Sequence, residues 1–368
     1  MSRIVILAHE AESLINFRGE LIKVLSQNGY DVIAMAPEQD YRNKVEEQLG
    51  VKYESINLDN TGMNPLKDLA TIYDINKKLR YYKPDIIFSY AIKPVIYGGL
   101  AAKFCNVEKI HSLIPGAGQV FLSKNLTTKI ISQLYKIGTK NNDTIFFQNP
   151  DDQKLFNDYN IININTDTYL VNGSGVKTDY YYNTEPKTDK ISFLLMARLI
   201  RPKGIIEYIK AAEKINKKKD DIEFKLLGPF HSNPSALTET EIYKWHDNGT
   251  INYLGVKEDV RPTIENTSVF VLPSYYREGV PRSILEAMSM GKPIITTDSP
   301  GCRETVIDGH NGFLIPPKDI IALKNAMDKF IKKPNLIQEM GQKSRKIALE
   351  KYDVHKVNQF MIEKMGLE

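Results

Sequence analysis

The chain has 368 residues, of which 42% are hydrophobic and 26% are charged, and its formal net charge is +4. This length predicts two domains with cores of their own, and the small net charge excludes a nucleic-acid-binding class. Cys105 and Cys302 lie too far apart for a metal-binding or redox motif and predict reduced thiols in a cytosolic protein. No apolar run approaches the ~20 residues that a membrane-spanning helix needs.

Apolar runs alternate with amphipathic segments through the first half of the chain. Strands are predicted at residues 3–9, 31–37, 51–58, 85–90, 109–116 and 143–149. Helices are predicted between them, at about 17–28, 68–84 and 95–105. This alternation predicts a parallel sheet with helices on both faces.

The same pattern restarts after a less regular stretch near residues 160–190. Strands are predicted at residues 191–198, 223–228, 251–255, 269–273, 293–298 and 312–317, and the last helices run from 319 to the end. The chain is therefore expected to be an α/β protein with two doubly wound units. Ligands of such sheets bind outside the carboxyl ends of the strands, so the cleft between two units is the expected site.

Residues 121–140 form a basic amphipathic segment. Leu122, Leu126, Ile130 and Leu134 recur at a spacing of four, and Lys124, Lys129, Lys136 and Lys140 stand off that face. Residues 109–142 contain no Asp or Glu. Two interpretations stay open: a helix packed on the core with a solvated basic side, or a helix that docks on an anionic membrane surface.

Two cations flank a turn that leads from a predicted strand into a helix. Arg198 and Lys203 stand in MARLIRPKG, where the free N–H groups of the helix N-terminus also favour anions. The arrangement suits a diphosphate; the alternative is a pair of solvated loop charges.

Two carboxylates lie eight residues apart in REGVPRSILEAMSMGKP. Glu286 falls in the first turns of a helix that begins near Pro281, where it could accept hydrogen bonds from both hydroxyls of a ribose. Glu278 lies before the turn and could meet a sugar hydroxyl or a cationic transition state. The alternatives are a helix-dipole contact for Glu286 and a loop charge for Glu278. Farther on, the turn at Pro300 and Gly301 could turn the N–H groups of Gly301, Cys302 and Arg303 toward phosphates.

These motifs together resemble the family 4 retaining glycosyltransferases of the GT-B fold. The resemblance is carried by MARLIRPKG, REGVPRSILEAMSMGKPIITTD and PGCRETVIDGHNGFLIPP. It implies two Rossmann-like domains facing a cleft: 1–172 for the acceptor and 173–351 for the nucleotide sugar, with a C-terminal helix at about 352–368 crossing back. YAIKPVIYGGLAA, LIPGAGQVF and DTIFFQNPDD resemble the subgroup that builds bacterial O-antigen and capsule repeat units, which includes the bacillosaminyl-lipid N-acetylgalactosaminyltransferase.

The resemblance also implies roles on the donor side. Arg198 and Lys203 would neutralise the leaving diphosphate, Glu286 would hold the ribose and Glu278 would contact the donor sugar. Other positions are expected to line the donor site: Gly228, Gly279, Val280, Pro281, Arg282, Gly301, Cys302 and Arg303. The donor is expected to be a UDP-sugar, and retention to use front-face attack without a metal or another cofactor.

The acceptor is expected to be a sugar on undecaprenyl diphosphate, handled by a cytoplasmic enzyme at the inner face of the membrane. Candidate acceptor residues are His9, Asn16, Phe17, Arg18, Lys93 and Gly116, although packing of the helix is favoured for Phe17. His111 is expected to point into the core. Two alternatives remain: a nucleotide-sugar 2-epimerase of the same fold, and a non-catalytic binding protein.

Overall fold

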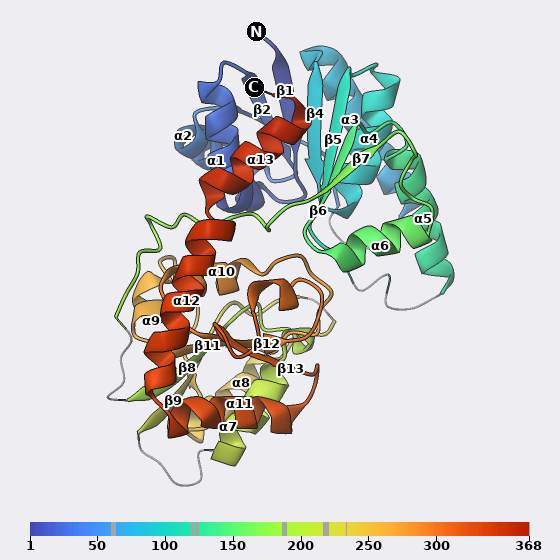
Figure 1. Ribbon diagram of the computed structural model, residues 1–368. Helices are drawn as coiled ribbons and strands as arrows, with labels where there is room; N and C mark the ends of the chain where they lie inside the picture. Colours follow the sequence, from blue (N-terminus) through green and yellow to red (C-terminus); the bar gives the residue numbers. More distant parts are fainter. Residues whose placement is uncertain are drawn as a thin grey trace. The chain divides into compact units, whose positions relative to one another are not determined.

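The computed structural model describes residues 1–59, 64–118, 121, 125–185, 190–215, 221–232 and 234–367. The chain divides into two compact units: residues 1–174 with 355–368, and residues 175–354 (Figure 1). The sequence placed this boundary two residues earlier, at 172.

Unit 1 is built on a parallel sheet in the order β3-β2-β1-β4-β5-β6-β7. Its strands are β1 (Arg3–Leu7), β2 (Asp31–Ala36), β3 (Lys52–Ser55), β4 (Ile86–Tyr90), β5 (Lys109–Ile114), β6 (Thr144–Phe147) and β7 (Asp167–Leu170). The strand order reverses between β1 and β4, which is the switch point where such sheets bind ligands. β7 lies in the stretch that the sequence left irregular, because this half-exposed edge strand has no apolar run.

Helices cover both faces of this sheet. They are α1 (Ala11–Gln27), α2 (Arg42–Leu49), α3 (Pro65–Tyr82), α4 (Ile92–Phe104), α5 (Leu126–Gly138), α6 (Pro150–Asp158) and α13 (Val354–Met365), with a 3-10 turn η1 (Gln39–Tyr41). One core lies under α1, α2 and α13, and the other under α3, α4, α5 and α6. The C-terminal helix α13 thus packs on the first unit, through residues such as Val357 and Met361 (Figure 1).

Helix α1 begins six residues before the predicted start. Its first N–H group, at Ala11, donates to the Glu38 carboxylate at 2.7 Å. A helix needs a partner for such an N–H, and here it comes from the loop after β2. Because Glu38 lies 27 residues away, the local pattern could not reveal the start.

Helix α5 turns a different face to the core than the spacing of its leucines predicted. Thr128, Ile131, Tyr135 and Gly138 are buried, whereas Leu126 and Ile130 are exposed. The close approach of α4 decides this, because a Cβ on Gly138 would lie 2.6 Å from the Ile96 Cα. Only glycine fits there, and the residues on the same helical face as Gly138 follow it inward. Leu122 and Lys124 lie outside the described residues.

Unit 2 has a parallel sheet in the order β10-β9-β8-β11-β12-β13. Its strands are β8 (Ile191–Met196), β9 (Ile222–Leu227), β10 (Asn252–Tyr253), β11 (Val269–Leu272), β12 (Ile294–Thr297) and β13 (Gly312–Ile315). Its helices are α7 (Ile205–Ile215), α8 (Glu239–Asp247), α9 (Arg261–Glu265), α10 (Arg282–Ser289), α11 (Ile320–Lys332) and α12 (Asn335–Lys351), with 3-10 turns η3 (Arg201–Lys203) and η5 (Arg303–Thr305). The order reverses between β8 and β11, so the loops after these two strands meet at a switch point.

In the described part of the chain, no helix is both long enough and apolar enough to cross a membrane.

Candidate donor and acceptor sites

An ion pair joins the loops that follow β8 and β11. Lys203 Nζ lies 2.5 Å from Glu278 Oε2, and Ser274 Oγ donates to Glu278 Oε1 at 2.7 Å. Both charged side chains are mostly buried, with exposed fractions of 11% for Lys203 and 15% for Glu278. Burial of a charge pair is tolerated only when it is hydrogen-bonded, as it is here. The sequence predicted both residues as functional but not that they pair.

The two loops are held together by a glycine. Gly204 adopts φ +79°, and a Cβ there would lie 2.1 Å from the Pro273 carbonyl oxygen. The backbone after Lys203 can therefore lie directly on the end of β11, which brings Lys203 within reach of Glu278. An ammonium group has three N–H donors, so Lys203 can bind Glu278 and an incoming anion at once.

Arg198 precedes Lys203 by five residues and is exposed, whereas Lys203 is buried. It follows Ala197, whose carbonyl oxygen would lie 1.9 Å from a Cβ on Gly228. Gly228 is therefore required for the ends of β8 and β9 to pack closely beside Arg198.

Glu286 is buried on α10, with 8% of its surface exposed. Its Oε1 accepts hydrogen bonds from Tyr181 Oη and Arg282 Nε, both at 2.9 Å. Burial raises the pKa of the Glu286 carboxyl group, while Arg282 and Tyr181 oppose that rise. Sequence reasoning missed Tyr181, which lies 105 residues from Glu286 and offered only its place in a run of three tyrosines.

The glycine turn after β12 packs on the loop that carries Glu278. Gly301 adopts φ +86°, and a Cβ there would lie 2.1 Å from the Gly279 carbonyl oxygen. The amides of Cys302 and Arg303 both donate to the Ser299 carbonyl, at 3.1 and 2.9 Å. Since those two donors are already used, Gly301 is the residue of this turn that best suits a phosphate contact.

The remaining residues expected around the donor are buried, paired with a neighbouring carboxylate or placed at a helix end. Burial raises the pKa of the Cys302 thiol to about 12, so it stays protonated. Arg303 Nε lies 2.8 Å from an Asp298 carboxylate oxygen. Val280 is buried in the core, and Pro281 is the N-cap residue of α10.

In unit 1, side chains from the loop after β1, from α1 and from the last residue of β4 meet at the carboxyl edge of the sheet. The His9 ring lies edge-on to Tyr90, with centroids 6.4 Å apart. Arg18 is 2% exposed, and its guanidinium carbon lies 5.5 Å from the Tyr90 ring centroid. Tyr90 Oη and Ser13 Oγ are hydrogen-bonded at 2.9 Å. His9 and Arg18 therefore share one aromatic neighbour, which the sequence did not single out.

Two residues of the second turn of α1 are exposed. Phe17 is 42% exposed, so the favoured prediction that it packs in the core is wrong. Asn16 beside it is exposed as well. Both residues stand one turn after the N-terminus of α1, on the side of the helix that leaves the core. A side chain there is available to a ligand.

Carboxylates lie close to two other acceptor candidates, Lys93 and Gly116. Lys93 Nζ contacts Asp68 Oδ1 at 3.1 Å and the Asp59 carbonyl oxygen at 2.7 Å. Gly116 lies in the loop after β5, where the next amide, at Ala117, donates to buried Asp152 at 3.0 Å. Lys93 would thus approach a diphosphate with its charge already partly neutralised.

His111 lies inside the core of unit 1, as the sequence predicted. It is 2% exposed, and neither ring nitrogen has a hydrogen-bond partner within the described residues. Burial lowers the pKa of His111 to about 4, so its ring is neutral near pH 7.

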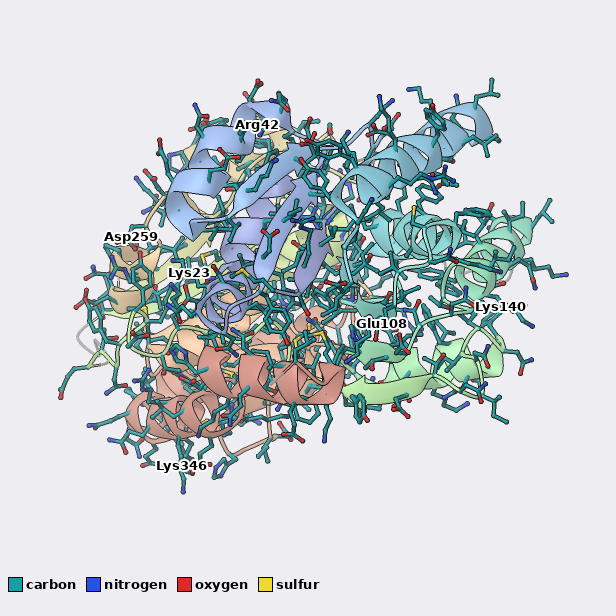
Figure 2. All side chains as sticks on the ribbon, turned by 90° about the horizontal axis from the view of Figure 1, so that it is seen from above. Lys23, Arg42, Glu108, Lys140, Asp259 and Lys346 are labelled. Atoms are coloured by element: carbon teal, nitrogen blue, oxygen red, sulfur yellow. The ribbon has the colours of Figure 1, made fainter. Side chains whose placement is uncertain are left out.

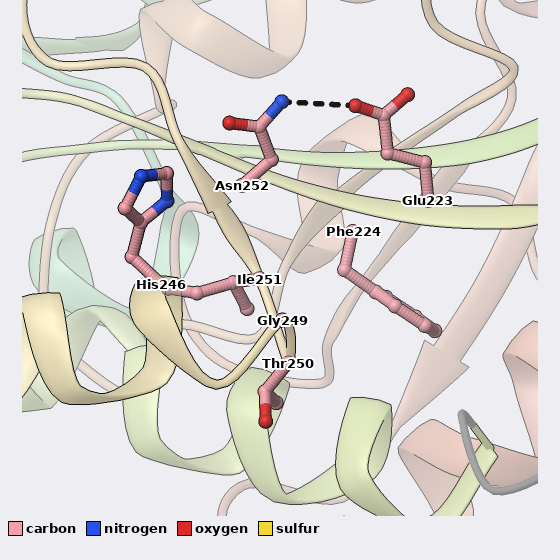
Figure 3. Close-up of a pocket in the computed structure, with 7 residues that line it drawn as sticks. All are labelled: Glu223, Phe224, His246, Gly249, Thr250, Ile251 and Asn252. Atoms are coloured by element: carbon pink, nitrogen blue, oxygen red, sulfur yellow. Dashed lines mark hydrogen bonds between the residues drawn. The ribbon is translucent and has the colours of Figure 1, made fainter.

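A separate shallow pocket of about 270 Å³ lies between α8 and the start of β9 (Figure 3). Asn252 donates to Glu223 at 3.0 Å there, and His246 stands on the opposite side (Figure 3). Glu223 lies near the amino end of β9, whereas Gly228 follows its carboxyl end. The pocket contains none of the predicted site residues. No cluster of His, Cys, Asp and Glu that could hold a metal occurs among the residues described above.

Comparison with known proteins agrees with this division of the chain. Residues 179–347 match the family profile described as "Glycosyl transferases group 1", and residues 3–149 match "Glycosyl transferase 4-like". The N,N'-diacetylbacillosaminyl-diphospho-undecaprenol alpha-1,3-N-acetylgalactosaminyltransferase of Campylobacter jejuni is 26% identical over 366 residues, 95% of each chain.

Two further similarities concern parts of the chain or its fold. The capsular polysaccharide biosynthesis glycosyltransferase CapM of Staphylococcus aureus is 27% identical over 157 residues, 43% of this chain and 41% of CapM. The crystal structure of Anabaena HepE in complex with UDP superposes with a TM-score of 0.79 at 17% identity, covering 100% of both chains. The latter shows a shared GT-B fold.

Proposed function

Because this chain belongs to the GT-B glycosyltransferases, with a 4-like first domain and a group 1 second domain, we propose that it transfers a hexose or N-acetylhexosamine from a UDP-sugar to a sugar on undecaprenyl diphosphate. The name of the Campylobacter jejuni relative supports the lipid-linked acceptor, and UDP bound to HepE supports the donor. The product would enter capsule or O-antigen synthesis at the cytoplasmic face of the cell membrane.

The buried Lys203–Glu278 pair carries this proposal. When the bond between the donor sugar and its diphosphate breaks, negative charge develops on the diphosphate and positive charge on the sugar. A fixed ammonium group beside a fixed carboxylate stabilises both at once, and more strongly where water is excluded. In the proposed complex Lys203 contacts the leaving diphosphate, Arg198 adds a second cation, and Glu278 faces the sugar.

Glu286 is proposed to accept hydrogen bonds from the ribose hydroxyls of the donor. The hydrogen bonds from Tyr181 and Arg282 oppose the rise in pKa that burial causes at Glu286 and so favour its ionised form, which can accept hydrogen bonds from both hydroxyls. Gly301 is proposed to place its amide at the diphosphate. Lys203 and Arg198 are proposed to neutralise the negative charge that develops on the leaving diphosphate, so the proposed reaction involves no metal.

We propose that transfer retains the anomeric configuration by front-face attack, with the leaving phosphate oxygen taking the proton of the acceptor hydroxyl. A double displacement would need Glu278 as a free nucleophile, but its two oxygens are engaged by Lys203 and Ser274. His9 and Arg18 are the acceptor-side residues of this proposal.

The test is a transfer assay with a panel of UDP- and GDP-sugars and a short polyprenyl-diphosphate sugar, read by mass spectrometry. A mass gain on the acceptor with one donor establishes transfer, and an NMR spectrum of the product in which the anomeric configuration matches that of the donor establishes retention. An isomerised donor without any acceptor gain would replace this proposal by a 2-epimerase. No change of any donor in a folded sample would leave a binding protein.

A further inference from the structure

The outward faces of α3 and α5 carry large apolar side chains. On α3, Leu66, Leu69 and Tyr73 are 79%, 63% and 73% exposed. On α5, Leu126, Ile130 and Ile137 are 73%, 45% and 53% exposed. A monomeric protein in water seldom exposes so many large apolar groups on two helices that flank the same third helix, so such a surface marks an interaction site. We call these six residues the α3/α5 surface.

Both helices face the same side of unit 1. They flank α4 and contact it, and with it they cover one core of the sheet (Figure 1). The buried residues of α3, such as Ile75 and Leu79, point to that core, and so do Ile131 and Tyr135 of α5. The apolar groups on the opposite side of each helix therefore point away from the sheet together.

The charge around this surface is positive. Helix α5 contains no Asp or Glu, and its Lys129 and Lys136 are exposed. Lys140, in the turn that follows the helix, is exposed as well and is labelled in Figure 2. Helix α3 has an exposed Lys77 on its outward side. The two acidic residues of α3 are neutralised by lysines, since Asp68 pairs with Lys93 at 3.1 Å and Asp74 with Lys78 at 2.8 Å.

We propose that the α3/α5 surface docks on an anionic phospholipid bilayer. An apolar stripe bordered by lysines matches the boundary between acyl chains and negative headgroups. A second copy of this chain would present the same positive charges and repel them, so lipid is the favoured occupant. This inference rests on the proposed lipid-linked acceptor.

The position of the surface fits that acceptor. Helices that connect parallel strands run antiparallel to them, so their first halves lie nearest the carboxyl edge of the sheet. Five of the six apolar residues lie in the first half of α3 or α5, and Ile137 lies near the end of α5. Docking would thus bring the bilayer close to the edge that carries His9 and Arg18, where a diphosphate anchored in lipid could arrive.

The test is co-sedimentation of the full chain with vesicles of phosphatidylglycerol and phosphatidylcholine, compared with pure phosphatidylcholine. One lysine near such a surface corresponds to about a fivefold change in partitioning, so the triple variant Lys129→Gln, Lys136→Gln, Lys140→Gln should bind roughly a hundredfold more weakly at low salt. The matched control replaces three exposed lysines of unit 2: Lys210→Gln, Lys244→Gln and Lys346→Gln. It should bind like the wild type.

Apolar variants complete the test. Leu126→Ser with Ile130→Ser, and separately Leu66→Ser with Leu69→Ser, should each weaken binding at least about tenfold while the fold survives, because these groups are exposed. Equal binding of the wild type to both vesicle types, or equal losses in the control, would overturn the proposal. So would a dimer in light scattering that the serine variants dissociate, since a second copy would then cover the surface.

The outcome is separable from that of the transfer assay. Turnover with a water-soluble acceptor that carries a short lipid should be unchanged in all these variants. If the wild type binds anionic vesicles but transfers no sugar, the proposed function fails and the docking surface stands. If it transfers sugar but ignores the vesicles, the docking proposal fails alone.

Discussion

Replacing Lys203 by alanine separates the structural role of the Lys203–Glu278 ion pair from the role proposed for it at the donor. The change removes the ammonium group and leaves the mostly buried Glu278 carboxylate without its cation, although the hydrogen bond from Ser274 remains. Breaking a fully buried pair costs about 3–5 kcal/mol. Because Glu278 is 15% exposed and keeps the hydrogen bond from Ser274, we expect a loss of about 2–3 kcal/mol in unfolding free energy.

The catalytic loss should be larger than this structural effect explains. Removing one preorganised charge stabiliser costs about 2–4 kcal/mol in the transition state, which is roughly a 30- to 1000-fold drop in kcat. The assay follows release of the nucleoside diphosphate, with circular dichroism in urea to measure the unfolding free energy of each variant.

The decisive comparison is a double-mutant cycle with Glu278→Gln. Neutralising Glu278 removes the unpaired charge, so Lys203→Ala with Glu278→Gln should regain most of the lost stability. The turnover of the double variant should still be roughly 30- to 1000-fold lower than that of Glu278→Gln alone. Equal turnover of the double and the Glu278→Gln variants would refute the reasoning, because Lys203 would then act only by holding Glu278.

Three further predictions concern the surroundings of the site and the core. Gly301→Ala should abolish most turnover, because the added Cβ would collide with the Gly279 carbonyl oxygen and displace the loop that carries Glu278. The control Gly309→Ala has a similar positive φ and open space around it, so it should cost only about 1 kcal/mol of stability and leave turnover intact. Equal activities of the two variants would contradict this reasoning. Tyr181→Phe should raise the KM for the donor more than it lowers kcat, and the rise should grow as the pH falls, because loss of the hydrogen bond raises the pKa of Glu286 further. A KM that does not change with pH in this variant would argue against a role of Tyr181 at Glu286. In the wild type, the unfolding free energy should fall by up to about 3 kcal/mol between about pH 6.5 and 4, because His111 takes up a proton there only in the unfolded chain. His111→Leu should remove this fall, and equal pH dependence of the two unfolding free energies would exclude the role of His111.

The sequence by itself determined the order of strands and helices and the place along the chain of most residues that we propose for the donor site. Apolar runs alternating with amphipathic segments reflect strands buried on both faces and helices buried on one, and this pattern survives in any doubly wound fold. Lys203, Glu278 and Glu286 were assigned correctly to the segments after strands, because strand ends and turn residues are local features.

Only the tertiary structure decided which groups meet. Glu286 is held by Tyr181 and Lys203 by Glu278, across 105 and 75 residues, and no periodicity encodes such partners. The inward face of α5 was likewise set by Gly138 against α4 and not by the spacing of the leucines. Local patterns report how much of an element is apolar, but the choice of the buried face depends on which side chains leave room for a neighbour.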